Sequence, residues 1–220
     1  MESRTKSSGP RAAAKRERRR RDREETRDGL IRAALGLAER GPFRDLTVDE
    51  IAGAAGLSRS AFYTRFRDKH DLLLSAMEEV ATRLYEMADR WWHGQGPPAD
   101  RARRALEGIV AVYAEQASLL RVATEVSTYD EEVRAVWLGI VERFIEATTE
   151  HIRSEQALGL IPAGLDPRAT AEGLTWMCER CAHVYIARGE RPPEEVVNAI
   201  APVWTAALYP GVIPAAQLRP

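Results

Sequence analysis

The chain has 220 residues, of which 30% are charged and 45% hydrophobic, a composition typical of a folded protein. Its two cysteines exclude a disulfide scaffold. No apolar run is long enough to cross a membrane and no secretion signal is visible, so we expect a cytoplasmic protein without a membrane partner.

Charge is distributed unevenly along the sequence. Residues 1–70 carry 18 Lys and Arg against 11 Asp and Glu, a net charge of +7, whereas residues 71–220 carry a net charge of −8. A basic front end on an acidic body indicates that the front end meets a polyanion.

The first 22 residues resemble a disordered basic arm. Ser, Gly and Pro come early, and the strongly basic run over residues 11–21 repels itself and buries nothing. Such an arm adds sequence-independent affinity for DNA. The alternative is a solubilising tail.

Helix signals then recur up to residue 92. Apolar residues at helical spacing predict a helix over about residues 24–40. Thr47 opens a second helix with a capping box, and Gly56 suits the left-handed cap that ends it. Ser58 caps a third helix, and residues 68–92 are predicted to form a fourth.

Residues 93–98, rich in Gly and Pro, are the clearest break in the sequence. Beyond them, apolar periodicity predicts further helices over about residues 99–116 with a short continuation to 127, and over about residues 131–158, 167–188 and 192–208. No alternating strand pattern and no internal repeat is visible. The pattern predicts an all-α protein.

Residues 47–66 have the pattern of a helix-turn-helix. Ala52 is small enough for two helices to cross closely, and Gly56 allows the sharp turn. Hydroxyls and guanidiniums occupy the outward positions of the second helix, and they suit phosphate oxygens and guanine edges. The alternative is an ordinary helical hairpin with a solvated face. The predicted DNA-facing side chains are Ser58, Arg59, Ser60, Tyr63, Thr64 and Arg65.

This region resembles the N-terminal signature of TetR-family regulators over about residues 24–75. The resemblance is carried by Thr47-Val-Asp-Glu-Ile-Ala, Gly56-Leu-Ser-Arg-Ser-Ala-Phe-Tyr-Thr-Arg-Phe66, Lys69 and Asp71-Leu-Leu73. It implies that Tyr63 and Lys69 hold phosphates and that Thr47 caps its helix near the DNA backbone. It also implies that Arg59, Ser60 and Arg65 face the bases.

The C-terminal helices carry aromatic residues among aliphatic ones, with few polar groups between them. Ligand pockets have this composition, although each aromatic taken alone also fits an ordinary core. The aromatic residues of this kind are Tyr113, Trp137, Phe144, Trp176, Tyr185 and Trp204, and the candidate polar groups are Thr148, Thr175, Cys178 and Glu179.

Residues 131–145, 174–180 and 203–209 resemble a mycobacterial repressor of the same family, one that controls an ethionamide-activating monooxygenase. Its ligand domain holds a long hydrophobic tunnel. The resemblance implies a tunnel here for a small hydrophobic effector, lined by Trp137, Val141, Phe144, Thr148, Thr175, Cys178 and Trp204.

The last two predicted helices are candidates for a dimer interface, because TetR-type proteins pair these helices into a four-helix bundle. Each carries an apolar stripe. The stripes are Ala171, Leu174, Cys178, Ala182 and Tyr185 on one helix, and Val196, Val197, Ile200, Val203, Trp204 and Ala207 on the other.

Cys178 and Cys181 form a C-x-x-C pair, with His183 nearby. The pair lies in mid-helix, away from the helix N-terminus that lowers a thiol pKa, and His183 is on a different face. Walker, nucleophile-elbow and H-E-x-x-H motifs are absent from the sequence. We expect buried structural thiols, no metal, no cofactor and no enzymatic activity; redox sensing and metal binding are the alternatives.

The predicted organisation is a disordered basic arm over residues 1–22, a three-helix helix-turn-helix DNA-binding domain over 23–70, and a helical ligand-binding and dimerisation domain over 71–220. The predicted function is a TetR-type repressor that binds a palindromic DNA operator as a homodimer and is released by a small hydrophobic effector. A sequence-nonspecific nucleic-acid-binding protein that uses the arm and a TetR-type activator are the alternatives.

Overall fold

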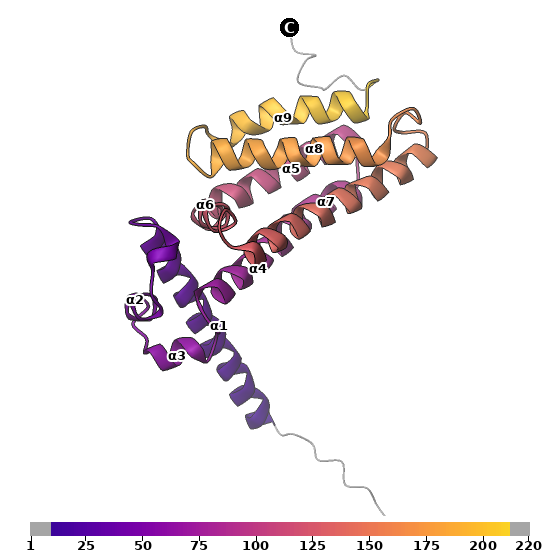
Figure 1. The fold of residues 1–220 in the computed structure, drawn as a ribbon. Helices are drawn as coiled ribbons and strands as arrows, with labels where there is room; N and C mark the ends of the chain where they lie inside the picture. Colours follow the sequence, from indigo (N-terminus) through magenta and orange to yellow (C-terminus); the bar gives the residue numbers. More distant parts are fainter. Residues whose placement is uncertain (1–9, 212–220) are drawn as a thin grey trace, which may run out of the picture. The chain divides into compact units, whose positions relative to one another are not determined.

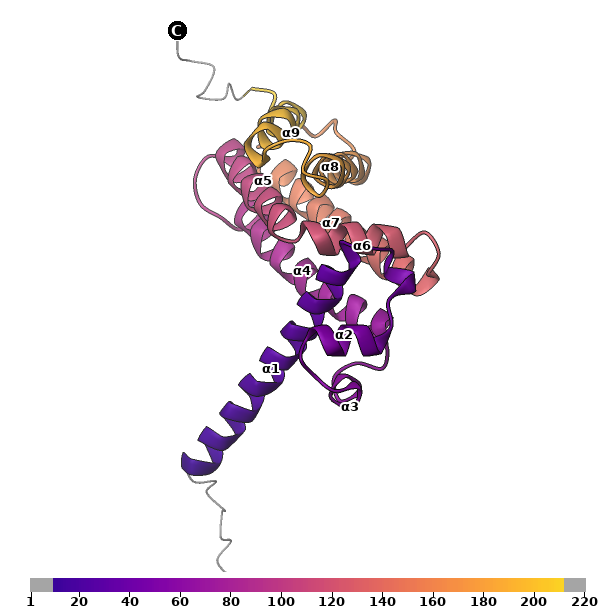
Figure 2. The same ribbon diagram turned by 90° about the vertical axis from the view of Figure 1, so that its left-hand side faces the viewer.

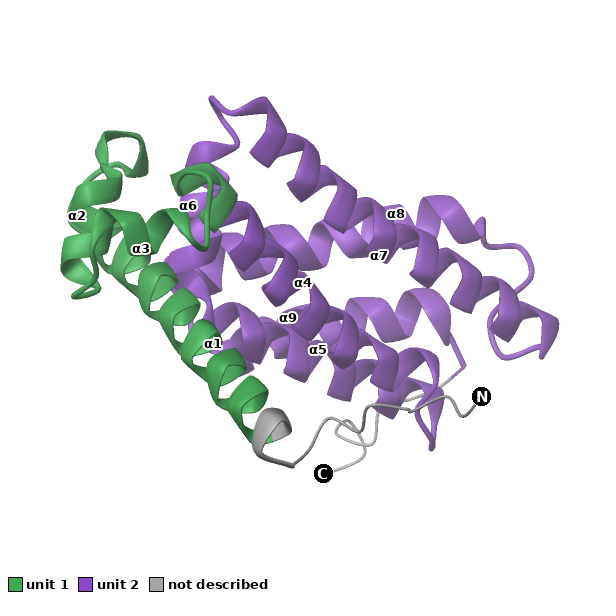
Figure 3. Ribbon diagram, turned by 90° about the horizontal axis from the view of Figure 1, so that it is seen from below, with its two compact units in different colours: residues 1–72 green, residues 73–220 purple. Residues whose placement is uncertain are grey.

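The computed structural model describes residues 10–211, with side chains from residue 14 onward, and within this range the protein is helical with no strand. The predicted all-α fold class is confirmed. The chain forms two compact units, residues 1–72 and residues 73–220 (Figure 3). Among the helices described, none has the length and apolarity that a membrane crossing requires.

Unit 1 contains the helix-turn-helix. Its elements are α1 (Pro10–Ala38), the 3-10 turn η1 (Phe43–Asp45), α2 (Val48–Ala54), α3 (Arg59–Tyr63) and the first residues of α4 (Lys69–Trp92). Buried side chains from every element meet in its core: Leu30, Ala34, Phe43, Ile51, Phe62 and Leu72.

Helix α1 begins much earlier than predicted, at Pro10 instead of near residue 24. The described part of the predicted disordered arm is therefore helical, and residues 1–9 lie outside the described range. The local physical reason is that Ala, Arg and Glu are strong helix formers. Ion pairs one turn apart add to this preference, such as Arg20 to Glu17 at 2.9 Å.

The turn between α2 and α3 depends on Gly56, whose φ of 68° lies in the left-handed region that favours glycine. The Leu57 N–H closes the turn by donating to the Ala52 carbonyl at 2.9 Å. The capping box at Thr47 and the side-chain cap at Ser58 start the two helices as predicted. Helix α3 ends at Tyr63, earlier than the expected end at residue 66.

Unit 2 contains the rest of α4 and all later helices. These are α5 (Pro98–Glu115), α6 (Ala117–Val126), α7 (Glu131–Ala157), α8 (Pro167–Cys181) with its π-helical continuation η2 (Ala182–Ile186), and α9 (Pro193–Leu208). Helix α9 lies beside α5 and α8, and α7 lies beside α8 (Figure 1, Figure 2). A Cβ at Gly108 of α5 would lie 2.8 Å from the Met87 sulfur of α4, so a larger residue there would force the Met87 side chain to shift.

The two stripes predicted to form a dimer interface mostly face the interior of their own chain. Ala171, Leu174, Cys178 and Ala182 are buried, and so are Val196, Val197, Ile200 and Trp204. The prediction was wrong for these residues because the most hydrophobic face of each helix packs within the chain first. The outward face of α9 carries a different apolar set, which is Ala199, Pro202, Val203 and Ala206.

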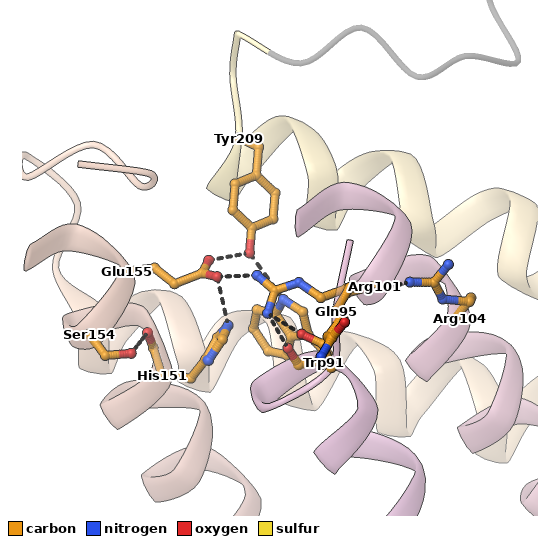
Figure 4. A network of polar contacts seen from close by, with 9 residues as sticks. Trp91, Gln95, Arg101, Arg104, His151, Ser154, Glu155 and Tyr209 are labelled. Atoms are coloured by element: carbon orange, nitrogen blue, oxygen red, sulfur yellow. Dashed lines mark hydrogen bonds and ion pairs between the residues drawn. The ribbon is translucent and has the colours of Figure 1, made fainter. Parts of the chain in front are cut away.

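A buried carboxylate joins four segments of unit 2 (Figure 4). Glu155 of α7 is 4% exposed and accepts hydrogen bonds from Tyr209 Oη at 2.6 Å and Arg101 Nη2 at 2.5 Å. His151 Nε2 lies 3.5 Å away, and Trp91 Nε1 donates to Tyr209 Oη at 3.0 Å. Burial acts to raise the pKa of Glu155, but the nearby His151 and the hydrogen bonds from Tyr209 and Arg101 outweigh it and lower the pKa to about 2.

Replacing this carboxylate tests how much the network stabilises the fold. Glu155→Gln leaves the Arg101 charge buried without its counter-ion, so we expect the free energy of unfolding at neutral pH to fall by about 3 kcal/mol. Urea denaturation measures it. The control is Glu131→Gln, which removes an exposed ion pair with Arg134 and should cost less than about 1 kcal/mol.

Comparing the wild type with Glu155→Gln at different pH values gives a second prediction. The folded pKa of about 2 lies below the unfolded value of 4.5, so the stabilisation by Glu155 is complete above that value and is lost as the pH falls toward 2. The stability difference between the wild type and Glu155→Gln should therefore shrink across this window. A difference that stayed constant on acidification would contradict the assignment.

Candidate DNA interface and effector cavity

The outer face of α3 exposes most of the predicted DNA-binding side chains. Arg59 donates to the Asp49 carboxylate of α2 and to Tyr63 Oη at 3.2 Å, and its guanidinium lies 5.5 Å from the centre of the Tyr63 ring. Tyr63 accepts from Arg59, so its own O–H proton is left for a phosphate oxygen. Sequence reasoning missed Asp49, because no local pattern marks a pair ten residues apart on two different helices.

Two predicted DNA-binding hydroxyls are already used inside the protein. Thr47 Oγ1 accepts from the Glu50 N–H at 3.2 Å and donates to the Glu50 carboxylate at 2.7 Å. Thr64 Oγ1 donates to the Ala61 carbonyl at 2.7 Å. Both side chains hold the ends of their helices, and their protons are engaged without DNA.

Ser58 and Ser60 lie together at the start of α3. Ser58 Oγ caps the helix by accepting from the Ala61 N–H at 3.2 Å, and it lies 2.9 Å from Ser60 Oγ. Arg65 follows the end of α3 and is half-buried, with Nη1 donating to the Thr64 carbonyl at 3.1 Å. Arg65 is thus less exposed than Arg59, and its base-facing role stays a prediction.

Lys69 differs most from its expected role. Its ammonium donates to the carbonyls of Phe43, Arg44 and Leu46 at 3.0, 2.5 and 2.8 Å. An ammonium has three protons, so this set uses all of them. Burial lowers the pKa of Lys69, against the effect of Asp45. In this structure Lys69 clamps η1 to the start of α4 and has no proton left for a phosphate.

Unit 2 contains a mostly apolar cavity of about 70 Å³, with walls from α4, α5, α7, α8 and α9. Nine side chains predicted to bind an effector line it: Tyr113, Trp137, Val141, Phe144, Thr148, Thr175, Cys178, Glu179 and Trp204. Trp176 and Tyr185, from the same set of aromatic residues, are not among its lining residues. Effector binding itself stays a prediction. Sequence reasoning missed the lining residues Leu84, Ala88, Trp91, Trp92, Ala102, Ala105, Leu106, Ile109 and Ile140, because on these amphipathic helices they are indistinguishable from ordinary core.

A second void of about 10 Å³ shares the side chains of Leu84, Trp137 and Ile140 with the cavity. It reaches Met77 on α4, whereas the cavity reaches Trp92 on the same helix. The two spaces therefore follow α4, with the Trp137 side chain in the wall of both.

Three polar groups in the cavity wall have no hydrogen-bond partner within the described part of the chain. They are Glu179 Oε2, Trp92 Nε1 and Trp204 Nε1. Glu179 is 6% exposed, and burial raises the pKa of its carboxyl group. Buried polar groups without partners are costly, so they mark positions where a ligand gains by supplying one.

The two cysteines are free thiols. The pKa of Cys178 is raised to about 12, mainly by burial and to a smaller extent by the nearby Cys181 and Glu179. The thiolate, which redox and metal chemistry require, is therefore suppressed. No group of residues suited to hold a metal is found in the described range.

A helix-turn-helix unit and a helical unit with an apolar cavity, in one chain, define a helical transcription regulator as the class of protein. Comparison with known families gives the next step. The model of bacterial regulatory proteins of the tetR family matches residues 30–76, and that of the C-terminal domain of the transcriptional regulator EthR matches residues 102–210. The chain belongs to the TetR family and has an EthR-type C-terminal domain.

Curated relatives agree over most of the chain. The HTH-type transcriptional regulator EthR of Mycolicibacterium smegmatis is 29% identical over 189 residues, 84% of this chain and 86% of the relative. EthR of Mycobacterium tuberculosis is 27% identical, covering 82% and 85%. The transcriptional regulator AcuR of Cereibacter sphaeroides is 32% identical over 150 residues, 65% of this chain and 68% of the relative. These relatives are named as regulators, and this chain is a transcriptional regulator and not an enzyme.

Solved structures share the fold. NalD of Pseudomonas aeruginosa, the secondary repressor of the MexAB-OprM multidrug efflux pump, matches with a TM-score of 0.70 at 19% identity, over 87% of this chain and all of that one. A putative TetR-family regulator from Syntrophomonas wolfei gives a TM-score of 0.72 at 15% identity, over 87% and 98%.

Replacing Lys69 separates a clamp from a phosphate ligand. Lys69→Met leaves three carbonyls without their shared donor, so we expect unfolding free energy to fall by about 1–3 kcal/mol. The dependence of duplex-DNA affinity on salt should keep its slope. A slope that flattens by about 0.9 would show a lost phosphate contact and contradict the clamp. The control for stability is the exposed Lys15→Met, expected within about 0.5 kcal/mol of wild type.

Proposed function

We propose that this protein is a repressor that binds a palindromic operator as a homodimer and leaves it when a small apolar effector enters the cavity of unit 2. The observation that carries the proposal is that residues of both sites belong to the same helix, α4. This helix begins with Lys69, which clamps the helix-turn-helix, and it also carries Leu84, Ala88 and Trp91, which line the cavity.

DNA reading is assigned to the outer face of α3. Arg59 presents a guanidinium that can bond guanine O6 and N7 together, and the tether to Asp49 limits the conformations it must lose on binding. Tyr63 and Ser60 are assigned to the phosphates beside it. The exposed basic residues near the start of α1, such as Lys15 and Arg16, add affinity that does not depend on sequence.

Effector release follows from the shared helix. A molecule that fills the cavity contacts Trp91 and Trp92 of α4, so it favours whichever position of α4 accommodates it. If that position places the helix-turn-helix units of a dimer at a spacing that misfits DNA, binding of the effector and of the operator oppose each other.

Pairing of two chains is assigned to the outward face of α9. Ala199, Pro202, Val203 and Ala206 are exposed at helical spacing, and Val203 has 47% of its surface open to solvent. An apolar stripe of this kind is suited to packing against a second copy of the same helix.

A footprint on DNA upstream of the gene for this protein tests operator binding. We expect a discrete protected palindrome, with half-sites one helical turn or a multiple apart. Arg59→Ala should weaken binding and lose about 1–3 kcal/mol of discrimination at one base position, because it removes a base contact. Tyr63→Phe should weaken binding to all sequences alike. Even coverage of the DNA would instead favour the nonspecific nucleic-acid-binding protein.

The oligomeric state tests the α9 surface. Val203→Glu places a charge in the proposed interface, so we expect a dimer in light scattering to become a monomer at micromolar concentration. Leu138→Glu on α7 is the matched control, since Leu138 is 41% exposed and lies outside the proposed interface. A wild-type monomer, or a Val203→Glu dimer as stable as the wild type, would refute this assignment.

A further inference from the structure

We propose that the cavity selects a cationic effector, an apolar molecule that carries an ammonium group, with Glu179 as its counter-ion. The inference rests on the proposed function, because it names the chemical class of the molecule that enters the effector cavity. The lining residues are mostly apolar, and Glu179 is the only carboxylate among the described residues that line the cavity.

The Glu179 carboxylate lacks the close donors that Glu155, the other buried acid among the described residues, has. It is 6% exposed, and its Oε2 accepts no hydrogen bond from the described residues. The nearest cation is the Arg180 guanidinium, whose Nε lies 3.8 Å from Oε2, beyond hydrogen-bond distance, on a side chain that is 64% exposed. By contrast, the equally buried Glu155 has close donors in Arg101 and Tyr209.

A buried carboxylate in this position has two ways to avoid an unpaired charge: it takes up a proton, or it meets a cation. Burial raises the pKa of Glu179, so taking up a proton costs less free energy when no ligand is bound. No Lys, Arg or His is among the described lining residues, so a cation on the cavity side of Glu179 has to be part of a bound molecule. An ammonium group supplies both the charge and the N–H donors that Oε2 lacks.

The remaining walls favour the same class of molecule. Tyr113, Trp137, Phe144 and Trp204 line the cavity, and the faces of such rings attract cations. Tyr113 is close enough to Glu179 for the carboxylate to raise the tyrosine pKa, beyond the larger effect of burial. The aliphatic part of the lining suits an apolar body. An anionic effector, such as a fatty acid, would place its negative charge beside the buried Glu179 side chain. No cation among the described lining residues would neutralise that charge.

The test uses three probes with one body and different ends: 4-phenylbutylamine, 4-phenylbutanol and 4-phenylbutyrate. Titration calorimetry measures each against the full-length wild type and Glu179→Gln. We expect the wild type to bind the amine about tenfold more tightly than the alcohol, and the carboxylate most weakly. Glu179→Gln, which keeps the shape of the side chain, should bind amine and alcohol with similar affinity. Glu172→Gln, an exposed change on the same helix, should behave as the wild type.

Equal affinity for amine and alcohol in the wild type, an amine preference that survives Glu179→Gln, or no binding of the amine would each overturn the inference. Release of footprinted DNA, measured with the same probes, is a separate readout. If the alcohol binds and releases DNA without an amine preference, the effector cavity stands and the cation selectivity fails. If the amine binds selectively but releases no DNA, the selectivity stands and effector-driven release fails.

Discussion

The arrangement of unit 2 depends on the need to neutralise one buried carboxylate. Water cannot solvate Glu155, so Arg101 and Tyr209 must reach it from other parts of the chain, and this requirement fixes how α5, α7 and the end of α9 meet. Tyr209 also accepts from Trp91 of α4, whose ring lies edge-on to Trp204 with centroids 5.2 Å apart. Both tryptophans line the cavity, so an effector that moves either ring acts directly on the network.

In unit 1, charged side chains likewise hold segments of the chain in position. Lys69 satisfies three carbonyls and so fixes where α4 begins after η1, and Asp49 fixes the guanidinium of Arg59 across the helix-turn-helix. A side chain held in place before binding loses less conformational freedom when it meets its partner. The ionic contacts of unit 1 therefore shape the proposed recognition surface as well as the fold.

Glu179 is the exception to this pattern of paired charges. Where Glu155 has close donors on two other segments, Glu179 faces a cavity and leaves one oxygen without a donor. In a structure whose other buried charges are paired, a buried polar group without a hydrogen-bond partner is expected at a functional site. The contrast between two equally buried glutamates is therefore the physical basis for assigning one to the fold and the other to a ligand.

The sequence by itself determined most of the helices, the turn at Gly56, the family and half of the side chains that line the cavity, because caps, breaks and apolar periodicity depend on near neighbours. Tertiary structure alone decided that Lys69 clamps a loop, that Glu155 pairs with Arg101 across 54 residues, and that the stripe containing Ile200 faces inward. These outcomes are set by which charges and apolar faces find one another in space, and such contacts leave no pattern in local sequence.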